Sequence, residues 1–230
     1  MSNQVSPSFQ LEPPIEIETG PNPNFSVIWM HGLGADGNDF VPIVRELELT
    51  GTPPTRFVFP HAPMMPVTCN NGYVMRAWFD ILSMTGGKRD INEATIIETV
   101  GLVRELIAKE NARGIPSNRI ALAGFSQGGA MAYTVGLTHP EPLAGMVALS
   151  GYIPAPQWVE NNFKEANRST PIFAAHGTQD EVLPIQLGIA ARDLAQKLNS
   201  AVEWHTWGMP HTVCLEEILL IGKWLGHAAV

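Results

Sequence analysis

The chain has 230 residues and a formal net charge of −8, and hydrophobic residues make up 45% of it. This length is common for one α/β domain, and the apolar content is enough for a large core. An acidic chain repels phosphate backbones, which argues against nucleic acid as a partner, and no apolar run is long enough for an integral membrane segment. Two cysteines, Cys69 and Cys214, make no disulfide framework and favour a reducing, cytoplasmic location, although the sequence leaves a single bridge between them open.

Short apolar runs alternate with longer helical patterns along the whole chain. This alternation is typical of a doubly wound, mostly parallel sheet with helices on both faces. We expect strands at residues 15–18, 26–30, 56–59, 119–124, 145–149, 170–175 and 201–207, and helices at 38–47, 90–111, 127–138, 185–198 and 212–225. Nothing reads as a linker, so residues 1–230 are expected to form a single domain, with a polar N-terminal leader at 1–13.

Two segments lack a regular apolar period. Residues 60–89 are rich in Pro, Gly and Asn and predict a long irregular loop, and residues 154–168 predict a second irregular or lid-like segment. A loop as long as the first one inside a compact domain is usually functional. These are the two segments that we expect to cover a site.

The first chemical motif is Gly-x-Ser-x-Gly at residues 124–128, with Ser126 at its centre. An apolar strand pattern leads into it and a helical pattern leads out, which is the context of a nucleophile elbow. Such a turn holds the serine hydroxyl clear of the sheet at a helix N-terminus, where N–H groups stabilise negative charge. A serine that merely caps an ordinary helix needs neither flanking glycine, so we interpret Ser126 as an acyl-transfer nucleophile.

A serine nucleophile needs a base to take its proton and an acid to orient that base. Of the seven histidines, only His211 lies in the turn between the last strand and the last helix, where an α/β-hydrolase presents its base. Asp180 follows the strand expected at 170–175 and precedes Glu181. Viewed alone, Asp180 also reads as a turn carboxylate, but the chain order Ser126, Asp180, His211 is the order expected in this fold.

Acyl transfer also needs N–H donors aimed at the developing oxyanion. In this fold one donor belongs to the residue after the nucleophile, here Gln127, and the other to a Gly-rich loop after an early central strand. Residues 31–34 read His-Gly-Leu-Gly and place two glycines around Leu33. We therefore predict the N–H groups of Leu33 and Gln127 as the oxyanion hole, with a plain loop glycine pair as the alternative for residues 31–34.

These motifs resemble the phospholipase/carboxylesterase family of α/β-hydrolases, the group that includes acyl-protein thioesterases, lysophospholipases and small bacterial carboxylesterases. The matching stretches are residues 31–40, 76–80, 124–130, 176–180 and 208–211. The resemblance implies the α/β-hydrolase fold and a hydrolase that uses neither metal nor cofactor. It also implies the triad Ser126, Asp180 and His211, with Leu33 and Gln127 as oxyanion donors.

The resemblance further implies an acyl site beside Trp78, which lies within residues 60–89. The competing reading is a tryptophan of the core, and the sequence weighs the two readings evenly. Other apolar residues of this segment are expected to add a shallow groove for acyl chains, namely Met64, Met65, Val67, Phe79 and Ile81.

The sequence thus predicts a serine carboxylesterase that hydrolyses short-to-medium acyl esters through an acyl-enzyme intermediate. An acyl-protein thioesterase or a lysophospholipase uses the same chemistry, so acylated proteins and lysophospholipids stay open as substrates beside small-molecule acyl esters. An inactive hydrolase fold that serves as a binding module is disfavoured, because the triad positions and both donor loops are all present. The sequence leaves a homodimer open.

Overall fold

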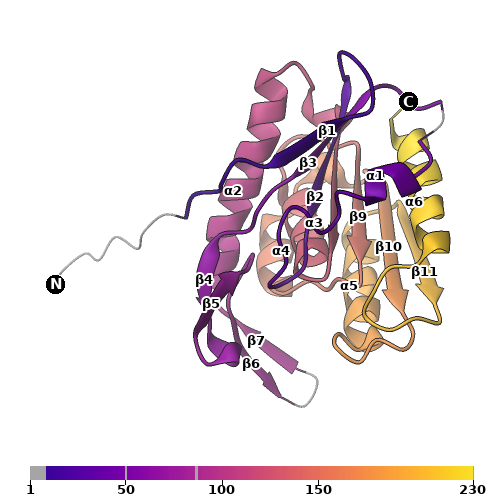
Figure 1. Cartoon of the computed structure of the whole chain (residues 1–230). Coiled ribbons are helices and arrows are strands. Elements are labelled where there is room, and N and C mark those ends of the chain that lie inside the picture. Colours follow the sequence, from indigo (N-terminus) through magenta and orange to yellow (C-terminus); the bar gives the residue numbers. More distant parts are fainter. Residues whose placement is uncertain (1–8, 50, 86–87, 230) are drawn as a thin grey trace.

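A seven-stranded sheet lies at the centre of the computed structural model, which describes residues 9–49, 51–85 and 88–229 (Figure 1). The strand order is β1-β3-β2-β8-β9-β10-β11, and every neighbouring pair is parallel except β1 with β3. The strands are β1 (Ile15–Glu18), β2 (Phe25–Met30), β3 (Thr55–Phe59), β8 (Ile120–Phe125), β9 (Gly145–Leu149), β10 (Ile172–Gly177) and β11 (Val202–Trp207). This mostly parallel, doubly wound sheet confirms the predicted fold class.

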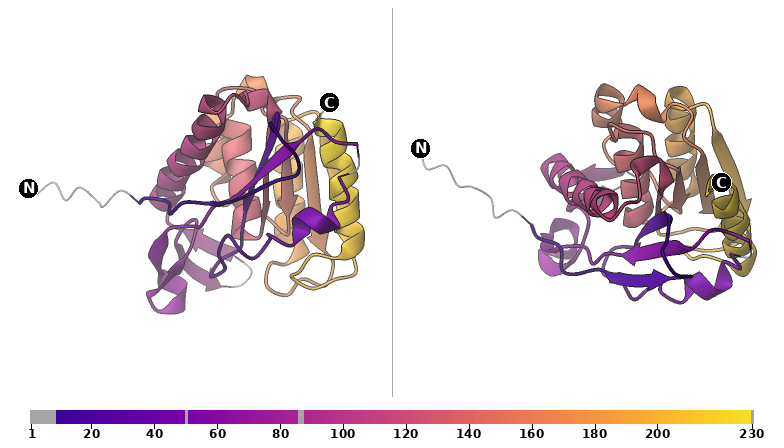
Figure 2. Two further views of the ribbon diagram at one scale, coloured as in Figure 1. Left: turned by 45° about the horizontal axis from the view of Figure 1, so that its top comes forward. Right: turned by 90° about the horizontal axis from the view of Figure 1, so that it is seen from above.

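Helices cover both faces of the sheet (Figure 2). The helices are α1 (Ile43–Glu46), α2 (Glu93–Ala112), α3 (Gln127–Thr138), α4 (Pro156–Asn162), α5 (Ile185–Leu198) and α6 (Leu215–Ala228), with 3-10 turns η1 (Thr68–Asn70), η2 (Ser117–Arg119) and η3 (Glu165–Asn167). Alternate side chains of β2 enter different cores: Ile28 and Met30 pack with α2 and α3, whereas Val27 and Trp29 pack with α1 and α6. Burial on both faces explains why this strand reads as a near-continuous hydrophobic run. None of the described helices is both long and apolar enough to cross a membrane.

The prediction of an irregular loop at residues 60–89 is wrong, because this segment folds into two antiparallel hairpins outside the main sheet (Figure 1). The hairpins pair β4 (Met64–Val67) with β5 (Tyr73–Arg76), and β6 (Ile81–Thr85) with β7 (Lys88–Ile91). Proline at position 66 and the short strand lengths hide the period-2 pattern that would have indicated β4.

Each hairpin turn nevertheless carries a signal in the sequence. Asn71 and Gly72 join β4 to β5, and both have positive φ, at 56° and 71°, a conformation that Asn and Gly tolerate best. The pair Gly86-Gly87 between β6 and β7 is typical of a tight hairpin, although it lies outside the described residues. Because β7 runs to Ile91, helix α2 begins at Glu93 and not at residue 90 as predicted.

Two further elements differ from the prediction. The helix expected at residues 38–47 is reduced to the single turn α1, because a turn precedes it in which the Asp36 carboxylate accepts the Asn38 N–H at 2.7 Å. The segment at 154–168 contains α4 and η3, which pack against α3. As far as the described residues go, this segment contributes nothing to the lining of the cavity beside Ser126, so its lid-like interpretation is wrong.

The leader predicted at residues 1–13 lies partly outside the described residues, which begin at Phe9. The Phe9 N–H donates to Glu98 Oε1 at 2.8 Å, and Leu11 packs against the core beside α2. The Glu12 carboxylate pairs with Arg76 at 3.0 Å. The described part of the leader is therefore attached to α2 and β5 by polar and apolar contacts.

Helix α6 buries a carboxyl group, and this predicts a pH-dependent stability. Neither oxygen of Glu217 has a hydrogen-bond partner among the described residues, and burial raises its pKa from an ordinary value of 4.5 to about 7, more than the nearby Cys214 backbone lowers it. Between these two values the unfolded chain loses this proton and the folded chain keeps it. The contribution of Glu217 to the free energy of unfolding therefore falls as the pH rises, by up to about 3 kcal/mol between acidic pH and a pH above 7.

We expect Glu217→Gln to remove this dependence. Relative to the parent chain, the free energy of unfolding of the variant should rise by about 2 kcal/mol or slightly more between pH 5 and pH 8, as measured by urea denaturation. The exposed neighbour offers a matched control, because Glu216→Gln removes the same formal charge from the same helix turn without a buried group. An equal effect of Glu217→Gln at both pH values would contradict the prediction.

Candidate active site

Ser126 lies on the sharp turn between β8 and α3, as the motif predicts. Its backbone has φ 57° and ψ −118°, a strained conformation for a residue other than glycine, and its N–H donates to Leu149 O at 2.9 Å. The turn requires both flanking glycines: a Cβ on Gly124 would overlap the backbone of Gly128, and a Cβ on Gly128 would overlap the Met30 carbonyl. The strain is thus held by close packing of the helix start against the sheet.

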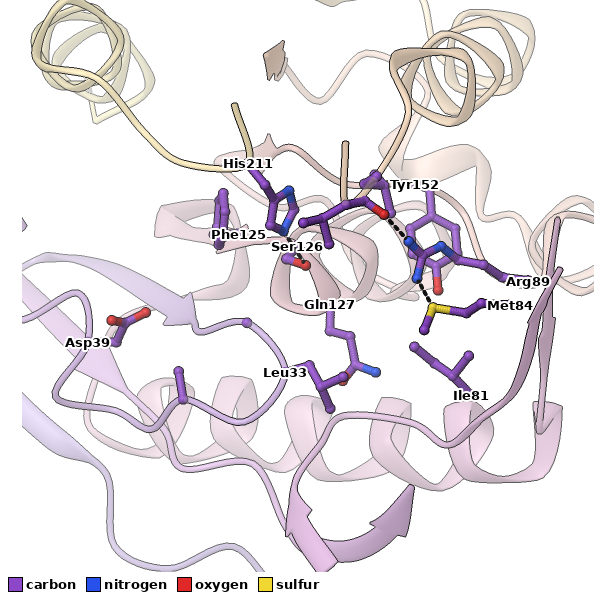
Figure 3. A pocket seen from close by; sticks show the side chains of 14 residues that line it. Leu33, Asp39, Ile81, Met84, Arg89, Phe125, Ser126, Gln127, Tyr152 and His211 are labelled. Carbon is purple, nitrogen blue, oxygen red and sulfur yellow. Dashed lines mark hydrogen bonds between the residues drawn. The ribbon is translucent and has the colours of Figure 1, made fainter. Parts of the chain in front are cut away.

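His211 and Asp180 meet Ser126 from two other loops. His211 Nε2 lies 3.0 Å from Ser126 Oγ, and His211 Nδ1 lies 2.6 Å from Asp180 Oδ2. The two loops are tied to each other, because the Gln179 N–H donates to Met209 O at 3.1 Å. The structure therefore brings the three predicted residues into one hydrogen-bonded series, which Figure 3 shows for Ser126 and His211.

The carboxylate of Asp180 is held by the chain that follows it. Its Oδ1 accepts the N–H groups of Val182 and Leu183 at 3.0 and 2.7 Å, which leaves Oδ2 facing His211. A second histidine, His176, lies behind it: its Nε2 donates to Leu183 O at 2.8 Å, and burial lowers its pKa. A neutral His176 supplies no competing positive charge, so the carboxylate is oriented by backbone donors and turned toward His211.

The predicted oxyanion loop is fixed by a buried histidine. His31 Nε2 accepts the Ala62 N–H at 3.0 Å, so the ring proton is on Nδ1, which donates to Gly32 O at 2.7 Å. Burial lowers the pKa of His31 to about 4, which keeps this tautomer neutral. The next glycine is tied to β5, because the Gly34 N–H donates to Arg76 O at 2.9 Å.

Both predicted donors lie at this site. Leu33 and Gln127 line the same cavity as Ser126 and His211, and a Cβ on Gly32 would lie 3.4 Å from the Ser126 Cβ, which places the loop beside the nucleophile. Within the described residues, neither the Leu33 N–H nor the Gln127 N–H has a hydrogen-bond partner outside regular secondary structure. Two unpaired N–H groups beside a serine hydroxyl suit an oxyanion hole, which stays a prediction.

The side chain of Gln127 has a role that the sequence did not indicate. Its Oε1 accepts the Trp78 N–H at 2.9 Å, and its Nε2 donates to Phe79 O at 3.0 Å. The Trp78 indole N–H in turn donates to His31 O at 2.8 Å. The start of α3, the chain before β6 and the oxyanion loop are thus joined by three hydrogen bonds.

Trp78 is a tryptophan of the core, the second of the two interpretations that the sequence left open. Its side chain is fully buried and is not part of the cavity lining among the described residues. Its indole N–H donates to the backbone carbonyl of His31, so Trp78 supports the oxyanion loop from within the core. Of the residues expected to form a groove, only Ile81 lines the cavity, because Met65, Val67 and Phe79 point into the core and Met64 lies exposed.

A cavity of about 280 Å³ opens beside Ser126. Figure 3 shows Asp39 on one side of Ser126 and, on the other, an arm lined by Ile81, Met84, Arg89 and Tyr152, and the lining of the cavity is mainly apolar. Apart from Ile81, the wall of this arm was missed from the sequence: Met84 and Arg89 come from the β6–β7 hairpin, and Tyr152, Val182 and Leu183 follow β9 and β10. A usable signal existed for the last group, because ligands of parallel sheets bind at the carboxyl ends of the strands.

This chain is similar to known proteins in both sequence and fold. The family model for phospholipase/carboxylesterase matches residues 15–227. An acyl-protein thioesterase 1 of Neurospora crassa is 36% identical over 95% of this chain and 92% of its own length, and carboxylesterase SOBER1 of Arabidopsis thaliana is 34% identical over 86% and 88%. The crystal structure of the latter protein superposes with a TM-score of 0.81 at 33% identity, covering 89% of this chain and 98% of that one.

The match of the family model covers nearly the whole chain, and the relatives align over nearly their whole length. A crystal structure of a Bacillus cereus carboxylesterase, 17% identical with a TM-score of 0.71 over 94% of each chain, shares the fold. The α/β-hydrolase fold predicted from the sequence is thereby confirmed. The chain belongs to the phospholipase/carboxylesterase family and is a serine hydrolase of the carboxylesterase type.

Proposed function

We propose that this hydrolase is a serine carboxylesterase that cleaves short-to-medium acyl esters through an acyl-enzyme on Ser126. The observation that carries the proposal is the hydrogen-bonded series Ser126–His211–Asp180, which opens into a mainly apolar cavity. The membership of the family supports the same chemistry. We expect the enzyme to act in the cytoplasm, in keeping with its two unpaired cysteines.

The first half of the proposed reaction forms the acyl-enzyme. Ser126 Oγ attacks the ester carbonyl carbon while His211 Nε2, 3.0 Å away, takes the hydroxyl proton. Asp180 keeps the proton of the neutral ring on Nδ1 and stabilises the imidazolium that forms. His211 then gives the proton on Nε2 to the leaving alcohol, and the acyl group stays on Ser126.

The second half repeats these steps with water as the nucleophile. His211 takes a proton from water, the hydroxide attacks the acyl carbonyl, and Ser126 leaves with the proton returned from His211. In both halves the carbonyl oxygen becomes an anion, which the N–H groups of Leu33 and Gln127 would bind at the start of α3. The positive end of the helix dipole favours the same charge.

The size of the cavity predicts a limit on acyl chain length. A cavity of about 280 Å³ has room for only a limited number of methylene groups. Each methylene that fills the apolar arm contributes at most about 0.8 kcal/mol, or about fourfold in kcat/KM. Across p-nitrophenyl esters from acetate to palmitate, each kept below its micelle concentration, we expect kcat/KM to rise over the short chains and then to flatten or fall.

A matched pair of variants locates this limit in the cavity. Ile81→Ala removes one wall of the apolar arm and should shift the best substrate to a longer acyl chain. Ile97 is 44% exposed on α2 and does not line the cavity, so Ile97→Ala should leave the optimum unchanged. A steady rise through palmitate, or a jump in rate above the micelle concentration, would assign the protein to the lipases instead.

A second candidate function is the removal of acyl groups from protein cysteines. The acyl-protein thioesterases among the relatives favour it, as do Met84 and Val182, which line the cavity and are 52% and 59% exposed at its rim. Exposed apolar side chains around a site suit a lipidated surface. An S-acylated peptide, its O-acylated serine analogue and a simple ester of the same acid distinguish the two functions. A protein thioesterase would have a higher kcat/KM on the S-acyl peptide than on either of the two oxygen esters.

A further inference from the structure

Arg89 supplies a positive charge to the side of the cavity away from Asp39. Its Nη1 donates to Met84 Sδ at 3.0 Å and its Nη2 to the Val182 carbonyl, and the guanidinium lies 5.7 Å from the centre of the Tyr152 ring. Sulfur is a weak acceptor. Arg89 forms no ion pair with any carboxylate of the described residues, so a half-buried guanidinium faces the cavity with its charge uncompensated.

Tyr152 adds an unused donor beside this charge. Its side chain is 6% exposed, and its hydroxyl has no hydrogen-bond partner among the described residues. The ring is fixed edge-on against Phe79, with centroids 6.2 Å apart. Buried hydroxyl groups are normally hydrogen-bonded, so a donor left unpaired in a cavity wall points to a ligand that completes it.

Apolar residues accompany this polar pair in the cavity wall. Leu33, Ile81 and Leu183 line the cavity that Ser126 and Arg89 also line, and Figure 3 shows Leu33 and Ile81 along its lower side. The acyl half of an ester is its apolar half, so an acyl chain attached to Ser126 would follow this wall and end at Arg89. Asp39 lines the opposite side of the cavity and does not neutralise Arg89.

We infer that Arg89 and Tyr152 form an anion subsite for the far end of the acyl chain, which selects esters whose acyl group ends in a carboxylate. The substrate class is then the half-ester, or half-thioester, of a dicarboxylic acid. This inference rests on the proposed esterase function, since it assigns the acyl group to this arm. The planar guanidinium fork matches a carboxylate with two parallel hydrogen bonds, and the Tyr152 hydroxyl gives a third donor.

The test compares charged and neutral esters of equal chain length. Monoethyl glutarate, adipate and suberate are paired with ethyl pentanoate, hexanoate and octanoate, and acid release is followed in a pH-stat at low ionic strength. One length should give the highest ratio of kcat/KM for the half-ester over its neutral partner. Arg89→Met keeps the length of the side chain and removes its charge, and should lower that ratio about tenfold, with a smaller fall for Arg89→Lys and Tyr152→Phe.

Controls separate a charge effect from a structural one. Arg89 also ties the hairpin to the loop at Val182, and a loss of that tie would lower kcat/KM on neutral and charged esters alike and leave the ratio unchanged. Arg192→Met removes a positive charge from α5 outside the cavity lining and should not alter the ratio. High salt should reduce the ratio of the parent enzyme and not that of Arg89→Met.

A binding measurement keeps this inference distinct from the proposed function. Calorimetry of monoethyl adipate with Ser126→Ala needs no turnover, and binding should weaken about tenfold when Arg89→Met is added. Failure to hydrolyse any ester, with Arg89-dependent binding intact, would overturn the esterase proposal alone. The anion subsite would be overturned if Arg89→Met changed neither the ratio of kcat/KM values nor the binding constant. It would also be overturned if every half-ester had a lower kcat/KM than its neutral partner.

Discussion

Replacement of Ser126 by alanine is expected to lower kcat for p-nitrophenyl butyrate by at least about a thousandfold. The only hydroxyl within hydrogen-bond distance of His211 Nε2 is that of Ser126, at 3.0 Å, so no other group among the described residues can take over the attack. The oxyanion donors and the cavity remain in the variant and leave a small residual rate. The thermal midpoint should stay close to that of the parent, because only one partly buried oxygen on a preserved turn is lost.

Ser150 provides a matched control for this substitution. It follows β9 as Ser126 follows β8, it also has a positive φ, 42°, and its buried Oγ has no partner among the described residues. Ser150→Ala should therefore keep most of the activity. A fluorophosphonate probe should label the parent and Ser150→Ala but not Ser126→Ala. A folded Ser126→Ala variant that still turns over ester at more than about a tenth of the parental rate would contradict the assigned nucleophile.

The parts of the site that depend on chain topology could be predicted from the sequence. Ser126, Asp180 and His211 each follow a strand of one parallel sheet, β8, β10 and β11, and the carboxyl ends of parallel strands lie along one edge. The glycines around Ser126 indicate that two backbone segments approach each other closely, because a Cβ at either position would overlap the neighbouring backbone. Order along the chain therefore implied proximity in space, and the structure brings the three residues together.

The cavity wall was harder to foresee because its residues come from elements without a strong periodic signal. The β6–β7 hairpin pairs with no strand of the main sheet, so its short strands lack the buried apolar run by which core strands are identified. Trp78 illustrates the same difficulty: it lies in the core, and its hydrogen bonds to the Gln127 side chain and the His31 carbonyl hold it there. Such side-chain orientations depend on tertiary contacts that one sequence does not record.

The second large effect is expected from Asp180→Asn, which should lower kcat on the order of a thousandfold or more with little change in KM. Oδ1 of residue 180 accepts two backbone N–H groups, from Val182 and Leu183, so the oxygen of the asparagine amide must occupy that place and its NH₂ must face His211. His211 Nδ1 then becomes an acceptor, and the ring proton moves to Nε2. An Nε2–H donates to Ser126 Oγ and cannot take its proton, so the fold and the substrate cavity persist while the base is lost.

Glu181 decides whether this effect belongs to Asp180 itself. It is the adjacent carboxylate, it is exposed, and none of its atoms is within hydrogen-bond distance of His211 among the described residues. Glu181→Gln removes the same charge from the same loop and should leave kcat nearly unchanged, because a screened surface charge contributes little at this distance. If Asp180→Asn kept most of its kcat and Glu181→Gln lost it, the carboxylate that orients the base would be Glu181, and the hydrogen bond of 2.6 Å between Asp180 and His211 would be structural only.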